Sequence, residues 1–202
     1  MTSSDVVLGK GAVGSGQVAR AALGTTYPDE VSAAFAALDP AFKKLGIVSE
    51  DGVTETEDET STNIIGWDGE VARVVRTEHT LTYTFTMIET TAATLGTVYR
   101  DENVLVTPAT EEHGAQLSVT IKARDGVRNV WRFALVDGAR KGEIWLPAAE
   151  VTERGDVTYV SSDAIKYPVT LTAFGDPDGD DPLAKAFIFW DDGVLLPPDP
   201  QE

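Results

Sequence analysis

The chain has 202 residues, of which 42% are hydrophobic and 24% charged, so its length and apolar content suit one globular domain with a sizeable core. It has no cysteine, which excludes disulfide bonds, thiolate nucleophiles and cysteine-ligated metal centres. The formal net charge of −17 disfavours binding to the outside of a nucleic acid, because that affinity depends on neutralising phosphates with Lys and Arg.

The negative charge is concentrated in two segments. Residues 49–70 hold eight acidic residues and no Lys or Arg, and residues 174–202 hold eight acidic residues and one Lys. A surface of this sign would let DNA pass without holding it, and solubility alone is the alternative interpretation. The chain shows neither a signal-peptide pattern nor a run of roughly eighteen apolar residues, so we expect a soluble protein with no membrane partner.

The first half of the chain predicts an arm, a strand and an acidic loop. Residues 1–15 are small and glycine-rich, and residues 17–23 form a candidate strand closed by turn residues. Residues 28–38 predict one or two helical turns, because acidic residues stand at their start. An acidic loop is then expected over residues 51–68, with a tryptophan corner at Trp67.

The clearest pattern is a long strand over residues 80–88. Its apolar positions are Leu81, Tyr83, Phe85 and Met87, and they alternate with the hydroxyl positions Thr80, Thr82, Thr84 and Thr86. A period of two predicts one apolar face and one hydroxyl face, and threonine favours the extended backbone because it is β-branched. A helix is predicted over residues 90–101, where apolar residues recur at spacings of three and four.

The second half of the chain returns to strand patterns. Strands are predicted over residues 103–106, 116–124, 129–136, 143–146, 156–160, 165–174 and 184–190. Asp125-Gly126 and Asp137-Gly138 predict hairpin turns. Many short strands with one or two helices indicate a mainly β fold, a sandwich or barrel. We expect one domain over residues 16–193 and an acidic, proline-rich tail over residues 194–202.

A possible nucleotide site begins at Gly9, where the chain reads G-x-G-x-x-G over residues 9–14. This fingerprint needs a preceding strand, a helix that opens at the third glycine and a second parallel strand. Gly16 and the turn residues 24–28 argue against such a helix, and a flexible arm is the simpler interpretation. A nucleotide-dependent enzyme therefore remains only an alternative.

A second motif lies at Asp176–Asp181, an acidic turn that resembles a calcium loop. An EF-hand would need glycine at the sixth position and glutamate at the twelfth, but Asp181 and Phe187 stand there. A calcium- or sugar-binding β-sandwich module is thus an alternative function. His79 and His113 lie in no triad or ligand-spaced cluster, so we expect no catalytic residue, cofactor or metal.

The wording of residues 45–54 and 67–99 resembles the major tail, or tail tube, proteins of long-tailed, non-contractile bacteriophages. The likeness includes Leu45-Gly46-Ile47-Val48, Trp67-Asp68-Gly69-Glu70, the strand at residues 80–88 and the helix that ends at Val98-Tyr99. Residues 24–28 and 38–42 fit the same pattern. The resemblance implies a β-sandwich with one flanking α-helix and long hairpin loops, and a structural protein without enzymatic activity.

The resemblance also implies how the protein works. Subunits would assemble in the host cytoplasm into stacked hexameric rings of the virion tail, with tape measure and tail terminator proteins as partners, and DNA would pass through the lumen without specific binding. The expected surfaces are a lumen face (Thr80, Thr82, Thr84, Thr86), an inter-ring loop (Glu55, Glu57, Asp58, Glu59, Trp67) and a basic partner face on the central strands (Lys122, Arg124, Arg128, Arg132). We expect the acidic loop to meet the basic strands of a neighbour.

Overall fold

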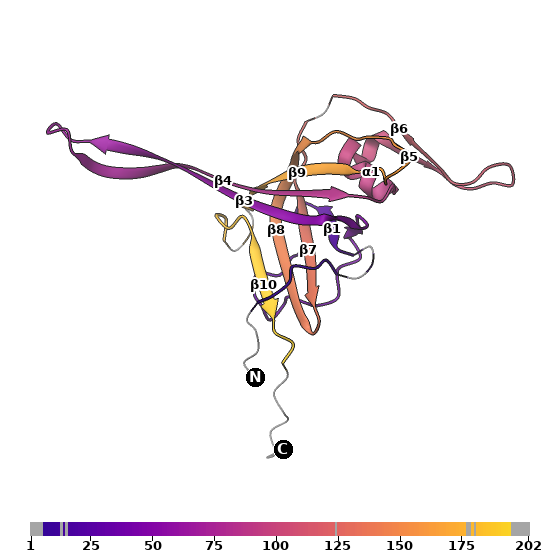
Figure 1. The fold of residues 1–202 in the computed structure, drawn as a ribbon, viewed down its shortest axis with the longest axis horizontal. Helices are drawn as coiled ribbons and strands as arrows, with labels where there is room; N and C mark the ends of the chain where they lie inside the picture. The colour runs from indigo at the N-terminus through magenta and orange to yellow at the C-terminus, as the bar shows by residue number, and fades with distance from the viewer. Residues whose placement is uncertain are drawn as a thin grey trace, which may run out of the picture.

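A computed structural model describes residues 6–12, 14, 16–123, 125–176, 179 and 181–194 of the chain (Figure 1). The described part is mainly β, with antiparallel sheets and one α-helix, which confirms the predicted fold class. None of its helices has the length and apolar character needed to cross a bilayer.

The elements follow one another along the chain with short connections. They are β1 (Val18–Ala22), β2 (Lys43–Lys44), β3 (Val48–Ile65), β4 (Val71–Met87), α1 (Ala92–Tyr99), the 3-10 helix η1 (Asp101–Asn103), β5 (Val104–Thr107), β6 (Gln116–Val119), β7 (Asn129–Asp137), β8 (Arg140–Arg154), β9 (Tyr167–Phe174) and β10 (Phe187–Asp191). The main sheet has the order β2-β1-β7-β8-β9-β4-β3, with β10 beside β8, and β5 and β6 form a separate arm.

Strand β8 connects the two halves of the main sheet. Its beginning, residues 141–145, pairs with β10, and its end, residues 148–154, pairs with β9. Two hydrophobic clusters result. The larger is built around Trp131, Tyr83, Phe85 and Phe133 under helix α1, and the smaller surrounds Trp145. The expected core role of Trp131 is confirmed, since its side chain is 1% exposed.

The predicted alternation of β4 is confirmed. Leu81, Tyr83, Phe85 and Met87 are buried, whereas the intervening threonines are half-buried or exposed. Burial of an apolar side chain of this size contributes about 1.5–3 kcal/mol, so this face of β4 anchors the hairpin to the body.

The acidic segment is not the loop that we expected but the strand β3. Val53 to Asp58 pair residue by residue with β4, and pairing continues to Ile65 beyond a bulge at Thr60. Threonines alternate with the acidic residues here, and their β-branched side chains favour extended backbone. Because both faces meet water, the pair needs no apolar face, and the hairpin extends far beyond the body (Figure 1).

Other local predictions were partly wrong. Residues 156–160 form no strand, and Asp125-Gly126 closes no hairpin, because β6 pairs with β5 rather than with β7. Residues 28–38 form a turn-rich segment instead of a helix. The turn at Asp137-Gly138 is confirmed: it joins β7 to β8, and Gly138 has the positive φ of 64° that such turns require.

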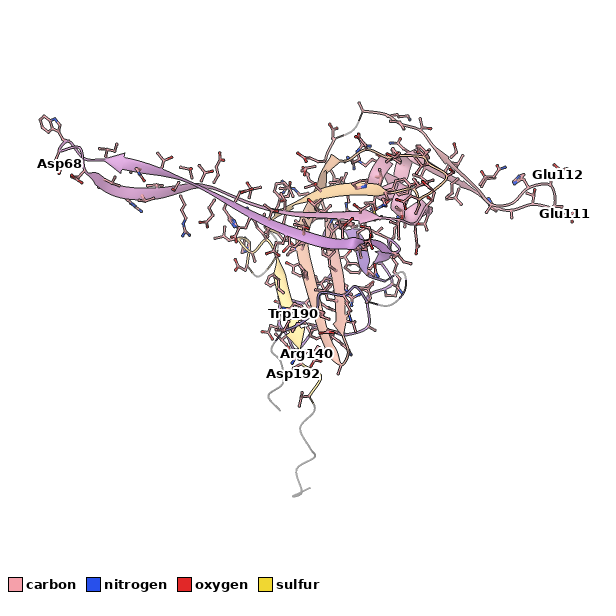
Figure 2. All side chains as sticks on the ribbon, viewed as in Figure 1. Asp68, Glu111, Glu112, Arg140, Trp190 and Asp192 are labelled. Carbon is pink, nitrogen blue, oxygen red and sulfur yellow. The ribbon has the colours of Figure 1, made fainter. Side chains whose placement is uncertain are left out.

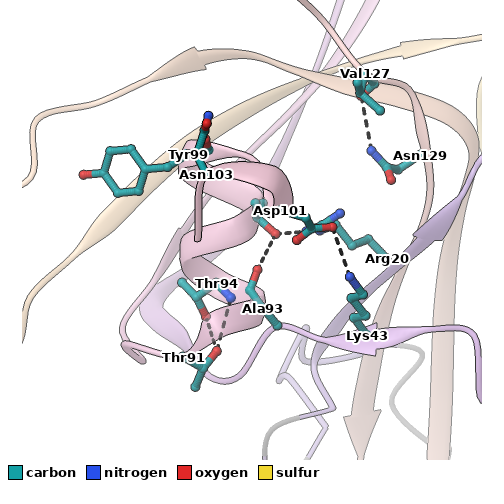
Figure 3. Close-up of polar contacts among 11 residues, drawn as sticks. Arg20, Lys43, Thr91, Ala93, Thr94, Tyr99, Asp101, Asn103, Val127 and Asn129 are labelled. Carbon is teal, nitrogen blue, oxygen red and sulfur yellow. Dashed lines mark hydrogen bonds and ion pairs between the residues drawn. The ribbon is translucent and has the colours of Figure 1, made fainter. Parts of the chain in front are cut away.

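Helix α1 is shorter than predicted because capping interactions fix both ends (Figure 3). The Thr91 hydroxyl accepts a hydrogen bond from the Thr94 amide at the N-terminus. At the other end Arg100 has a φ of 82°, and Asp101 turns back to bind Arg20 of β1 at 2.6 Å and Lys43 at 3.0 Å. Gly96 is needed here, since a Cβ would lie 2.1 Å from the Asp101 carboxylate.

Candidate assembly surfaces

The predicted nucleotide fingerprint has a different structural context. Gly11 forms an antiparallel bridge with Leu135, and the strand β1 follows Gly16 where a helix would be required. All named strand pairs of the described residues are antiparallel, so no βαβ unit is present there. Of the Asp176–Asp181 turn, residues 177, 178 and 180 lie outside the described residues.

The outer face of the sheet β3-β4-β9-β8 is covered with threonine hydroxyl groups. Since side chains alternate along a strand, the register places Thr54 beside Thr84 and Thr170, and Thr56 beside Thr82 and Thr172. The Thr84 and Thr170 hydroxyl oxygens lie 3.2 Å apart, and those of Thr152 and Thr172 lie 2.9 Å apart. We call this surface the threonine face.

The threonine face is wider than the sequence analysis expected. Only its β4 members were predicted, and the alternation Thr170-Leu171-Thr172 is the signal that would have revealed those of β9. The charged side chains that these strands direct to the face are Glu150 and Glu153, which are paired in register with Thr172 and Thr170. Arg128 lies at the border, 4.1 Å from the centre of the Phe174 ring.

The opposite face of the hairpin carries three glutamates in succession. Glu55, Glu57 and Glu59 are paired in register with Tyr83, Leu81 and His79, so the apolar face of β4 becomes acidic where the hairpin leaves the body. Tyr83 donates a hydrogen bond to Glu55, and burial together with this carboxylate raises the pKa of Tyr83. Asp58, two positions from Thr56, belongs instead to the side of the threonine face.

Glu57, Glu59 and His79 are the group among the described residues whose ligand atoms could surround a metal ion, since these atoms lie within 4.8 Å of one another. All three side chains are exposed and already have protein partners. His79 Nε2 lies 2.8 Å from Glu57, and Arg76 Nε lies 3.4 Å from Glu59. The arrangement is that of a solvated cross-strand ion-pair network.

The hairpin ends in an apolar tip around Trp67. A tight turn closes it, with the Gly66 amide donating to the Glu70 carbonyl at 2.7 Å. The Trp67 side chain is fully exposed, and the neighbouring strand ends expose further apolar side chains: Ile64, Ile65, Val71 and Val74. We call these five residues the hairpin tip. Its distance from the body is visible at Asp68 in Figure 2.

The predicted basic residues do not share one strand surface. Lys122 and Arg128 lie in the connection before β7 and are exposed, and Arg124 lies outside the described residues. Arg132 is on β7, where it forms an ion pair with the buried Glu143. The placement on central strands was therefore wrong for Lys122 and Arg128, because β6 ends at Val119.

Two strand edges flank the threonine face without a partner among the described residues. One is the outer edge of β3, which pairs only with β4. The other is the end of β8, because β7 leaves β8 at Ala149 and residues 151–154 pair only with β9. A cavity of about 700 Å³ lies at this second edge, lined by Val151, Thr152 and Arg154 with Lys122.

These surfaces define a class of protein: a β-structured subunit with open sheet edges and a projecting arm. Comparison with known families is more specific. Residues 6–191 match the family model described as phage tail tube protein, and the chain therefore belongs to the phage tail tube protein family. It is a structural protein of the phage tail, and thus of the virion. None of the curated proteins matches the chain significantly.

Proposed function

We propose that copies of this chain join side by side into closed rings, and that the rings stack into a tube that conducts DNA. The observation that carries this proposal is the threonine face, which lies between two unpaired strand edges. Unpaired N–H and C=O groups at an edge favour pairing with another strand, and a second copy offers the matching edge.

The number of strands supports edge-to-edge joining of identical copies. The four strands β8, β9, β4 and β3 alternate in direction, so the two outer strands run in opposite directions. When β3 of one copy lies beside β8 of the next, the pair is antiparallel, and the pattern continues around a ring. Such a heterologous contact closes in one direction, while stacking extends the assembly in the other. Six copies per ring is the number that the sequence resemblance implies.

The chemistry of the threonine face suits a channel lining. Hydroxyl groups hydrate readily, and the carboxylates of Glu150 and Glu153 repel phosphates. Since tight DNA binding needs Lys or Arg to neutralise phosphates, DNA would pass over this face without being held. Thr80, Thr82, Thr84 and Thr86 would line the lumen in this arrangement.

The projecting hairpin is the proposed contact to a further copy. Its acidic residues Glu55, Glu57, Asp58 and Glu59 would face cationic side chains such as Lys122 and Arg128, and Trp67 would contribute apolar contact. A subunit of this kind acts by assembly rather than by catalysis. The partners would be further copies, a tape measure protein inside the tube and a terminator at its end, with assembly in the host cytoplasm of a long-tailed, non-contractile phage.

Electron microscopy of the concentrated protein, alone and with other tail components, tests the proposal. We expect rings or tubes for the wild type and none for the double variant Glu57→Lys/Glu59→Lys. The matched control is Glu111→Lys/Glu112→Lys, which changes the charge equally at the end of the β5–β6 arm (Figure 2) and should assemble. Normal tubes from the first variant would refute the role of the acidic residues, and the absence of any ordered assembly with tail components would refute the function.

A further inference from the structure

We infer that the hairpin tip of one copy binds a groove on the body of another copy, beside β10. The inference rests on the proposed tube assembly and names the surface that receives the tip. The groove has a volume of about 730 Å³, and its apolar lining includes Val7, Val31, Phe35 and Trp190. We call it the β10 groove.

The β10 groove is held in shape by packing and hydrogen bonding. Trp190 lies over Gly142 of the paired strand, where a Cβ would be only 2.5 Å from the indole ring. Phe35 has an unusual φ of 63°, and its amide points to the buried Glu143 carboxylate at 3.4 Å. A preformed apolar groove that leaves Trp190 48% exposed favours binding over collapse.

The hairpin tip has the matching chemistry. Trp67 is fully exposed, and Ile65, Val71 and Val74 lie together on one face by their register. A large amphipathic indole that enters an apolar pocket is typical of the residues that dominate binding energy. The tip and the groove lie far apart on one chain, as Asp68 and Trp190 show in Figure 2, so a second copy must supply the tip.

Charges around the two surfaces are complementary in sign. Asp68 and Glu70 flank Trp67, and Arg140 lines the groove. The Arg140 guanidinium donates to the Val6 carbonyl at 3.4 Å and has further N–H groups to offer a carboxylate. On the other side, Arg73 of the hairpin would meet Asp191 and Asp192 of the groove. Such alternation selects one orientation of the partner.

The direction of the proposed edge pairing points the tip to this groove. A β3 strand that lies antiparallel to β8 of another copy proceeds from the Arg154 end of β8 toward the Arg140 end. The ten residues that follow Glu55 span about 34 Å as a strand. The groove contains Arg140 itself, so polarity and reach both agree with the contact.

Disulfide crosslinking between two differently tagged full-length chains tests the inference, and the lack of native cysteine makes it unambiguous. One chain carries Glu70→Cys, which keeps Trp67, and the other carries Val31→Cys in the groove. The control partner carries Leu105→Cys, an exposed apolar position on the β5–β6 arm. We expect at least tenfold more heterodimer with Val31→Cys than with the control, and a return to the control level when Trp67→Ala is added to the first chain.

Equal yields for the two partners would overturn the inference while tubes seen by microscopy would leave the proposed function standing. A yield that is independent of Trp67 would also overturn it. A further arm uses the groove chain ended after Val194. We expect an unchanged yield, whereas a crosslink that forms only after this truncation would identify the chain's own residues 195–202 as the occupant and contradict the inference.

Discussion

Arg132 on β7 and Glu143 on β8 form an ion pair that is buried within the smaller hydrophobic cluster. The Arg132 Nη2 atom donates to Glu143 Oε1, and the second carboxylate oxygen accepts from the Trp145 indole at 2.8 Å and from the Phe35 amide. Glu143 is 3% exposed, so its charge depends on these donors for stabilisation. The pair therefore ties the wall of the β10 groove to the central strands.

Removing Arg132 should destabilise the fold strongly, because it leaves Glu143 charged and buried without a counterion. We expect Arg132→Ala to lower the free energy of unfolding by about 3–5 kcal/mol. Urea denaturation followed by tryptophan fluorescence measures the change. The control Arg76→Ala removes an exposed partner of Glu59 and should cost less than about 1 kcal/mol. Similar losses for the two variants would show that Glu143 does not need its partner.

The contact between Asp101 and Arg20 should make stability depend on pH in the acidic range. Burial by itself would raise the pKa of Asp101, but hydrogen bonds and charge from Arg20 and Lys43 outweigh it and lower the pKa below 3.8. A carboxylate with a depressed folded pKa stabilises the fold above its unfolded pKa, and this contribution is lost as the pH falls through the folded pKa. Asp101→Asn should thus be less stable than the wild type at neutral pH.

The difference between the two proteins should shrink as the pH falls below about 4. Denaturation series between pH 6 and pH 2.5 measure it. The control is Asp163→Asn: its hydrogen bond with Lys166 also lowers the pKa of Asp163, but this pair is fully exposed and should affect stability little. A constant difference across the series would contradict the assigned role of Asp101.

The sequence predicts β4 well because one of its faces is in the core. Leu81, Tyr83, Phe85 and Met87 record that burial as a period of two, and the threonines between them record solvent. The same reasoning fails for β3 beyond Glu55, since a hairpin that is surrounded by water needs no apolar period. Its strand character rests on β-branched threonines and on pairing with β4, and pairing partners are not local information.

The candidate surfaces could be predicted only as single residues. Trp67 and the acidic residues of β3 are recognisable in the sequence, but their extension far from the body is a property of the whole hairpin. The β10 groove joins Val31, Phe35, Arg140 and Trp190, which are distant in sequence and meet only through the β8–β10 pairing. Tertiary contacts of this kind leave no periodic signal.

The threonine face should gain DNA affinity when it is given positive charge. Thr84→Lys/Thr170→Lys places two cations at neighbouring exposed positions of β4 and β9. We expect salt-dependent binding to double-stranded DNA, with a steeper salt slope by about two phosphate contacts, whereas the wild type does not bind. Fluorescence anisotropy at several salt concentrations measures it. Comparable binding by the control Thr107→Lys/Ser118→Lys on the β5–β6 arm would show that only net charge matters.

Shortening the hairpin should separate folding from assembly. Replacing residues 59–79 by Asn-Gly joins Asp58 to Thr80, which are already paired, through the two-residue turn that hairpins prefer. The removed side chains lie outside both hydrophobic clusters, so we expect the free energy of unfolding to change by less than about 1 kcal/mol. Urea denaturation measures this.

The same variant should form no tubes, because it lacks the hairpin tip and most of its acidic residues. Electron microscopy beside the wild type measures assembly. The matched control shortens the other arm by joining Thr107 to Gln116, which are also paired, through Asn-Gly and should still assemble. If the shortened hairpin built normal tubes, the contact between copies would have to lie wholly in the body of the subunit, and the proposed role of the projecting arm would be wrong.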